Sequence, residues 1–280
     1  MTLNQQPHTN LPVKRDLTLM YILSTIIAVL MASAAITGLL YRTSVYPTDD
    51  LLHAFVPNDV VNLFIGLPTL LGSIWLARRG RLIGLLFWPG ALFFALYNYL
   101  IYVLAMPLNI AFLLCLTLVM LSVYTLIGLV ASIDGRAVQQ QLTGAVPQKL
   151  AGGILTGLGC LFLLWALSVI VNGLSGETAL TDTVRATNMT DFIIAPAWII
   201  GGVLLWRREA LGYVAGVGSL FQASMLFIGL IVFILVQPLL TTEAFAYVDL
   251  IVVFVMGLIC FVPFALFVRG VVSNPDANAT

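Results

Sequence analysis

The sequence predicts an all-α polytopic membrane protein, in which eight transmembrane helices form two parallel four-helix repeats. Hydrophobic residues make up 61% of the 280 residues and charged residues only 9%, against about 25% charged residues in soluble domains. Eight apolar stretches fill almost the whole chain, and each approaches the ~20 residues that a helix needs to cross a bilayer. The connections between them are too short to bury a core of their own.

The expected spans follow the apolar stretches in chain order. The two longest connections, 42–58 and 174–190, lie on the same side of the membrane. In the first of them, Leu51, Leu52, Phe55 and Val56 share one face of a short helix, which we expect to lie in the membrane interface. The sixth span is short, and we expect it to begin one turn earlier than the apolar run. The spans are expected at 17–41, 60–77, 82–105, 109–133, 150–173, 192–206, 211–236 and 250–268.

The first span also has features of a secretory signal. Lys14 and Arg15 precede an apolar run that contains the small-residue sequence Ala32-Ser33-Ala34, as at a signal-peptide cleavage site. The apolar run continues through Leu40, well beyond an ordinary signal core. The pattern therefore favours a retained span.

The placement of the charges predicts the orientation. Lys and Arg near the ends of spans accumulate on the cytoplasmic side of a membrane. With a cytoplasmic amino terminus, only Arg42 and Arg185 lie outside, and we predict an inner- or plasma-membrane protein with cytoplasmic tails at 1–16 and 271–280. The ten basic residues inside are Lys14, Arg15, Arg78, Arg79, Arg81, Arg136, Lys149, Arg207, Arg208 and Arg269. The acids outside are Asp49, Asp50, Asp59, Glu177, Asp182, Asp191, Glu243 and Asp249.

The two halves of the chain share an order of landmarks, which predicts a first repeat at 17–146 and a second at 147–270. Each half has an acid before a span that contains a proline, and a double arginine after it. These landmarks are Asp59, Pro68 and Arg78-Arg79 in the first half, and Asp191, Pro196 and Arg207-Arg208 in the second. Parallel repeats occur in transporters, whose sites lie at the repeat interface. A duplicated helical bundle without transport is the alternative.

One stretch also resembles known sequences. It comprises Asp59-Val-Val-Asn-Leu-Phe-Ile-Gly-Leu-Pro68, Leu76-Ala-Arg-Arg-Gly80, Tyr97-Asn-Tyr99, Tyr102, and Asn109 with Phe112-Leu113. Over about residues 55–125 the chain is similar to a widespread group of uncharacterised bacterial multi-pass membrane proteins. The resemblance implies a polytopic membrane protein and supplies no activity or residue roles.

Several kinds of chemistry lack the residues that they need. The histidines are His8 and His53, both outside the expected spans, so a haem pair or a buried zinc site would lack ligands. Cys115, Cys160 and Cys260 have no paired spacing and are typical of small buried residues. We therefore expect no catalytic residues, no metal, no cofactor and no nucleic-acid partner, and we expect no enzyme activity.

Three acids are expected at the outer starts of spans. Asp59, Asp191 and Asp249 precede or begin apolar runs, where a carboxylate caps a helix amino terminus and complements its dipole. An acidic vestibule for cations is the alternative. No charged residue falls near the middle of an expected span, whereas ion-coupled transporters keep such groups there. This favours a small neutral or lipid-like ligand, or no ligand.

The strongest candidate for a binding site is the polar group in the third span. Asn98 is flanked by Tyr97 and Tyr99, and Tyr102 follows one turn later on the same face. Asn98 lies ~10 Å below the outer surface, so its amide needs a partner, and Asn62 in the second span is the expected neighbour. In the alternative, the tyrosines form an aromatic belt and Asn98 is a structural link between helices.

Small residues and prolines predict details of the packing. The pairs Gly153/Gly157 and Gly212/Gly216 have the spacing that lets helices approach closely. Pro68 and Pro89 lie inside spans and are expected to kink them. Two functions remain open: a permease or binder of a small neutral or lipid-like molecule in the bilayer, and a non-transporting scaffold or regulatory subunit. A polar cavity that reaches Asn98 would favour the first.

Overall fold

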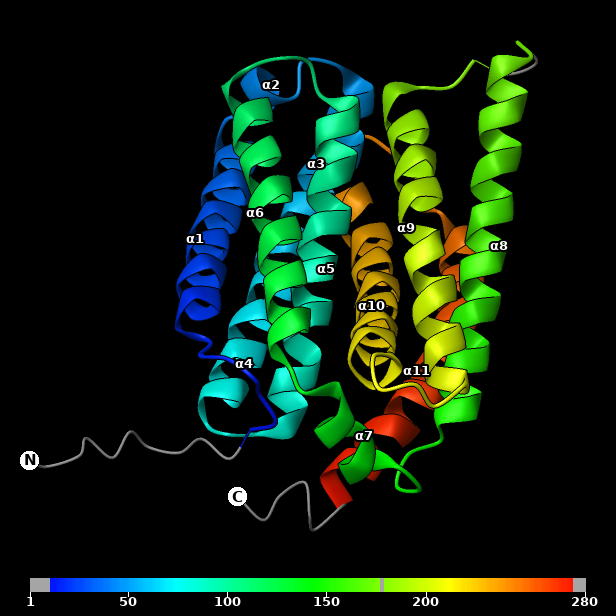
Figure 1. The fold of residues 1–280 in the computed structure, drawn as a ribbon. Coiled ribbons are helices and arrows are strands. Elements are labelled where there is room, and N and C mark those ends of the chain that lie inside the picture. The colour runs from blue at the N-terminus through cyan, green and yellow to red at the C-terminus, as the bar shows by residue number, and fades with distance from the viewer. Residues whose placement is uncertain (1–10, 177–178, 274–280) are drawn as a thin grey trace, which may run out of the picture.

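A computed structural model describes residues 11–176 and 179–273 (Figure 1). In this part of the chain, eight helices are long and apolar enough to cross a membrane, and no extended strand is present. The predicted class, an all-α polytopic membrane protein, is confirmed. His8, Glu177 and residues 1–10 and 274–280 of the predicted tails lie outside the described residues.

The eight spans are built from nine α-helices and two short stretches of wider π-helix. The π-helix η1 joins α3 to α4 within the second span, just before Pro68, and η2 precedes α10 in the seventh span. Two short helices, α2 (Arg42–Val45) and α7 (Gly135–Leu142), lie in connections. The segments that form the spans are α1 (Thr18–Leu40), α3 (Asp49–Val61), η1 (Asn62–Gly66), α4 (Leu67–Arg78), α5 (Leu82–Ala105), α6 (Ile110–Ser132), α8 (Gln148–Leu174), α9 (Asp182–Trp206), η2 (Gly212–Gly216), α10 (Val217–Leu240) and α11 (Tyr247–Ser273).

The second and sixth spans begin much earlier than the sequence predicted. The second begins at Asp49 rather than at residue 60, and the sixth begins at Asp182 rather than one turn before residue 192. The expected interfacial helix is therefore wrong: Leu51 and Phe55 lie in the first turns of the second span and are buried. Asp50, Asp59 and Asp191, which look like parts of connections in the sequence, bond to other helices.

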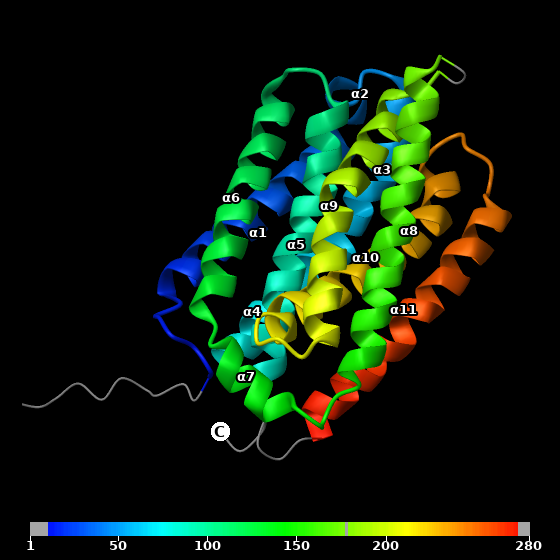
Figure 2. The same ribbon diagram turned by 45° about the vertical axis from the view of Figure 1, so that its right-hand side comes forward.

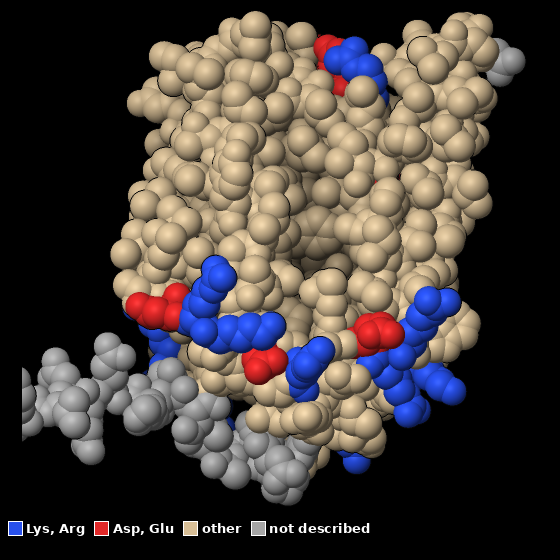
Figure 3. Space-filling view, in the orientation of Figure 1, with Lys and Arg blue, Asp and Glu red and all other residues tan. Residues whose placement is uncertain are grey.

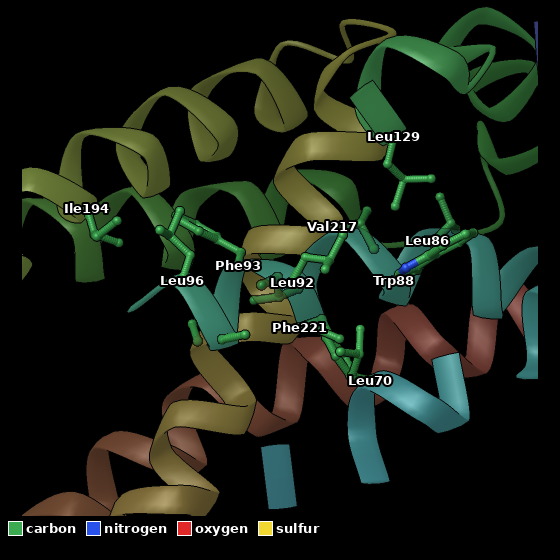
Figure 4. Close-up of a cluster of buried hydrophobic side chains, with 14 of the residues drawn as sticks. Leu70, Leu86, Trp88, Leu92, Phe93, Leu96, Leu129, Ile194, Val217 and Phe221 are labelled. Atoms are coloured by element: carbon green, nitrogen blue, oxygen red, sulfur yellow. The ribbon is translucent and has the colours of Figure 1, made fainter. Parts of the chain in front are cut away.

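The third span is the centre of the bundle. In an 18-residue apolar stretch of α5, 83% of the residues are buried, whereas the same share does not exceed 44% in any other span. The helix packs against α4, α6, α9 and α10, and both views show it beside α10 (Figure 2). Figure 4 shows Leu92 of α5 beside Val217 of α10, and Phe221 of α10 beside Leu70 of α4. Since outer helices such as α1 and α8 expose leucine, isoleucine and valine, the bundle has the surface that lipid requires.

The charged residues mark the two ends of the bundle. The eight alternating spans place the ten basic residues named above at one end, which we call the basic end, together with α7. Figure 3 shows most of the visible Lys and Arg there. Arg42 and Arg185 lie at the opposite end, where Arg185 pairs with Asp182 at 2.9 Å. The side of the membrane that each end faces stays a prediction.

Two features of the fold agree with an internal repeat. In each half the first span packs against both the second and the fourth, namely α1 with α4 and α6, and α8 with α9 and α11. In addition, α4 and α9 end in turns of the same type. Gly80 (φ 74°) and Arg208 (φ 63°) both have left-handed backbones and donate to the carbonyls of Ala77 and Leu205, respectively. Such a turn satisfies the last carbonyls of a helix. The parallel repeat itself stays a prediction.

Candidate functional site

A cavity of about 320 Å³ lies between the two groups of four spans. Its walls come from α3 and α5 in the first group and from α8, α9 and α10 in the second. Figure 3, in the orientation of Figure 1, shows that the face of the molecule between α6 and α9 is hollowed at mid-height. Most of the cavity wall is apolar, and its aromatic members are Phe55, Phe94, Phe162, Trp198, Phe227 and Phe233.

One side of the cavity is polar. Three side chains of α9, Thr183, Thr187 and Asp191, lie one helical turn apart and all line the cavity, together with Asn58, Tyr97 and Asn98. Tyr97 Oη donates to Asp191 Oδ1 at 2.7 Å, which joins α5 to α9. Asp191 is only 8% exposed, and among the described residues it has no ion pair and no second hydrogen-bond partner.

The predicted polar group around Asn98 is only partly present. Asn98 lines the cavity, but its Nδ2 donates to the carbonyl oxygen of Phe94 in the same helix, at 3.0 Å. The expected partnership with Asn62 is wrong. Asn62 is fully buried at the start of η1, and neither of its amide atoms has a partner among the described residues. Asn98 needs no second helix because a carbonyl one turn earlier is within its reach.

The two remaining tyrosines face a different site. Tyr102 Oη donates to Asp59 Oδ1 at 2.8 Å, and Tyr46 Oη donates to Asp59 Oδ2 at 2.6 Å. Tyr99 Oη donates to the carbonyl oxygen of Met31 at 3.3 Å. Gly38 of α1 closes this group, since a Cβ at that position would collide with the Asp59 carboxyl and the Tyr46 hydroxyl. We call Asp59, Tyr46, Tyr102 and Gly38 the Asp59 cage.

The Asp59 cage has the character of a structural contact. Asp59 is 1% exposed, so its two tyrosine hydroxyls take the place of water. Burial, and after it the charge of Asp59, raises the pKa of Tyr46, which lies in the connection before α3. The Tyr46 hydroxyl therefore stays protonated and donates.

The expected capping role of two acids is wrong. Asp59 lies ten residues after Asp49, the first residue of α3, and Asp191 lies nine residues after Asp182, the first residue of α9. The caps are Thr48 and Thr181, whose side chains accept from the backbone N–H groups of Leu51 and Val184. It follows that two carboxyl groups do lie inside spans, contrary to the sequence prediction. Asp249 does lie in the first turn of α11, where a carboxylate complements the helix dipole.

Further polar contacts join the two groups of spans at the end of the bundle opposite the basic end. Asp50 accepts hydrogen bonds from the backbone N–H and the hydroxyl of Thr183, at 3.1 and 2.6 Å. His53 pairs with Glu243 at 2.8 Å, and its carbonyl oxygen accepts from Gln237 Nε2 at 3.3 Å. These contacts hold α3 against α9 and α10 beside the cavity.

Sequence reasoning missed the contribution of α9 to the site. Thr183, Thr187 and Asp191 recur at intervals of four residues, so they share one face of a helix. That polar stripe was visible in the sequence, but the segment looked like a loop. Among the described residues no group of His, Cys, Asp and Glu could hold a metal ion.

Comparison with protein-family models, with curated proteins and with solved structures finds no match to this chain. The function is therefore argued from the geometry of the cavity.

Proposed function

We propose that this multi-pass membrane protein binds a small, mostly apolar molecule in the cavity between its two groups of four spans, as a permease or as a ligand-binding membrane protein. The observation that supports the proposal is the cavity itself, which reaches Asn98 and Asp191. A bundle that served only as a scaffold would be expected to pack this space, because protein interiors are as dense as organic crystals.

The composition and size of the cavity support a ligand of this class. Small-molecule sites have volumes of about 300–1,000 Å³, mostly apolar walls and a few polar groups that orient the ligand. The cavity has about 320 Å³, an aromatic wall and one polar side. The role proposed is binding, without a chemical step. The protein is proposed to lie in an inner or plasma membrane, with its basic end in the cytoplasm as the positive-inside rule predicts.

The test is the recovery of a bound molecule. The full-length protein is purified from its membrane in mild detergent, denatured and extracted, and the extract is analysed by mass spectrometry. An Ala54→Phe variant places a ring in the cavity wall, and Ala197→Phe makes the same change on an exposed face of α9. We expect a small molecule to copurify with the wild-type and Ala197→Phe proteins and to be absent from the extract of Ala54→Phe.

The opposite result would favour a different function. If no molecule accompanies the wild-type protein, or if Ala54→Phe retains it in full, the cavity is not a ligand site. A non-transporting scaffold or regulatory subunit would then be the better account of the bundle.

A further inference from the structure

We propose that the ligand carries a protonated amine on an apolar body, and that Asp191 holds the amine while the aromatic wall holds the body. The inference rests on the proposed function, because it names the class of molecule that the same cavity would take. It starts from the carboxyl group on the polar side of the cavity.

Asp191 is buried and only partly bonded. One oxygen accepts from the Tyr97 hydroxyl at 2.7 Å, and no described residue bonds to the other. A buried carboxylate with an unmet oxygen is costly unless a donor or a cation reaches it. Because Asp191 lines the cavity, a bound molecule can supply that group.

Asp59 shows what the chain does with a carboxyl group that has only a structural role. Both of its oxygens accept from tyrosine hydroxyls, at 2.6 and 2.8 Å, and Gly38 packs so closely against it that a Cβ at residue 38 would collide with the carboxyl group. Asp191 is almost as buried, yet it has one tyrosine instead of two and a cavity instead of a packed neighbour. The comparison indicates that its second oxygen is kept for a ligand.

The protein offers Asp191 no cation of its own. The cavity wall contains no Lys, Arg or His among the described residues. Arg185, six residues earlier in α9, is half exposed and pairs with Asp182. An ammonium group is therefore the complement that the site lacks, since charge-assisted hydrogen bonds to a carboxylate are the strong ones.

The remainder of the wall favours an apolar body. Phe94, Phe162, Trp198 and Phe227 line the cavity beyond its polar side. Aromatic side chains bind apolar groups and also attract cations at their ring faces. A phenylalkylamine has both parts, and its size suits a cavity of about 320 Å³.

The test compares two molecules that differ in one group. Binding of 2-phenylethylammonium and of 2-phenylethanol is measured by calorimetry on the full-length protein in lipid nanodiscs at neutral pH. We expect the amine to bind at least about tenfold more tightly than the alcohol. Asp191→Asn should remove this preference, because an amide cannot replace the charge. Asp59→Asn is the matched control and should keep the preference, since its cage is closed to the cavity.

A second measurement serves if Asp191→Asn does not fold. The wild-type protein is treated with dicyclohexylcarbodiimide, a reagent that modifies carboxyl groups in apolar surroundings. Peptide mass spectrometry then measures the rates of modification of Asp191 and Asp59 separately. We expect 2-phenylethylammonium to slow the modification of Asp191 more than the same concentration of 2-phenylethanol does. Asp59 should be unaffected by either compound.

The outcomes separate the two proposals. Equal binding of amine and alcohol, unchanged in Asp191→Asn, would overturn the amine and leave the ligand-binding function standing. If neither compound binds, the chemical identity of the molecule recovered from the purified protein tests the inference. A recovered molecule with a basic nitrogen supports the inference, and one without it overturns the inference alone. No recovered molecule and no binding would overturn both.

Discussion

The hydroxyl of Tyr102 offers the sharpest test of the Asp59 cage. It donates to Asp59 Oδ1 at 2.8 Å, and Asp59 is 1% exposed, so water cannot take its place. Tyr102→Phe keeps the ring, which stacks on Phe55 with the ring centroids 4.0 Å apart. The change therefore removes the bond to Asp59 together with two longer contacts of the same hydroxyl, to the Phe55 carbonyl oxygen at 3.3 Å and from Asn58 Nδ2 at 3.4 Å.

The size of the effect follows from two opposing estimates. A hydrogen bond contributes about 0.5–1.5 kcal/mol in soluble proteins, and about 1.5–3 kcal/mol where one partner is charged. Between membrane helices the average is about 0.6 kcal/mol and the maximum about 1.7, because helices apart in the membrane also find partners. The Tyr102 bond is short and its acceptor is fully buried, so we expect a loss of about 1–2 kcal/mol. The contact from Asn58 Nδ2 to the same hydroxyl is 3.4 Å long and adds little.

The measurement is the free energy of unfolding from a titration of mixed micelles with sodium dodecyl sulfate. The matched control is Tyr124→Phe, because Tyr124 is 63% exposed on α6; its change should stay within about 0.5 kcal/mol. If Tyr102→Phe is no more destabilising than this control, the hydroxyl does not stabilise the buried Asp59, and the Asp59 cage is not a stabilising contact.

Three further predictions concern packing, Asn98 and orientation. Gly90→Ala should destabilise the bundle by about 1–3 kcal/mol, because its Cβ would meet the Gly218 carbonyl oxygen and lie 2.8 Å from Phe221 Cδ1. Gly153→Ala meets no atom within 4 Å and should leave the stability unchanged or raise it; equal losses in the same titration would contradict the helix contact. Asn98→Leu should cost less than about 1 kcal/mol, because the amide bonds only within its own helix, and a loss above about 2 kcal/mol would mean an interhelical partner. In a variant without native cysteines, a cysteine beside Arg136 should be protected from an impermeant thiol reagent in intact cells and one beside Thr181 labelled; the reverse pattern would refute the orientation.

The existence of the eight spans could be predicted from the sequence, but the extent of two of them could not. Apolar length identifies a span because every backbone polar group must bond internally in lipid. The residues of α3 and α9 that precede the predicted spans include Asp50, Asp59 and Asp191, and these residues look like parts of connections in the sequence. Three of their partners, Thr183, Tyr102 and Tyr97, are 43 to 133 residues away in the chain. No local pattern reveals such contacts.

The glycine pairs illustrate the same limit. Gly212 and Gly216 do lie in a tight contact, since a Cβ at either position would collide with α9. A Cβ at Gly153 or Gly157 meets nothing within 4 Å, so this pair is not in a helix contact within the chain. In the same helix it is Gly152 and Gly159 that approach α9. The spacing of small residues predicts that a helix can pack closely, and the neighbouring helix decides which face does so.

Two of the residues predicted for the candidate site line the cavity, and the others do not. Tyr97 and Asn98 line the cavity, whereas Tyr99 and Tyr102 bond to α1 and α3. The residues predicted for the site, from Asn62 to Tyr102, all lie in the first half of the chain. The carboxyl group of the cavity comes from α9 instead, so the site is shared between the halves.

This sharing gives the proposed ligand a mechanical consequence. The bond from Tyr97 to Asp191 joins the first group of spans to the second beside the cavity. An ammonium group on Asp191 would compete with the Tyr97 hydroxyl for the carboxylate or add to it, and either change alters the strength of the link between α5 and α9. Asp59 has no such effect, because both of its tyrosines belong to the same group of spans as Asp59 itself. Of the two buried carboxyl groups, only Asp191 lies where the binding of a ligand can be felt by both halves of the bundle.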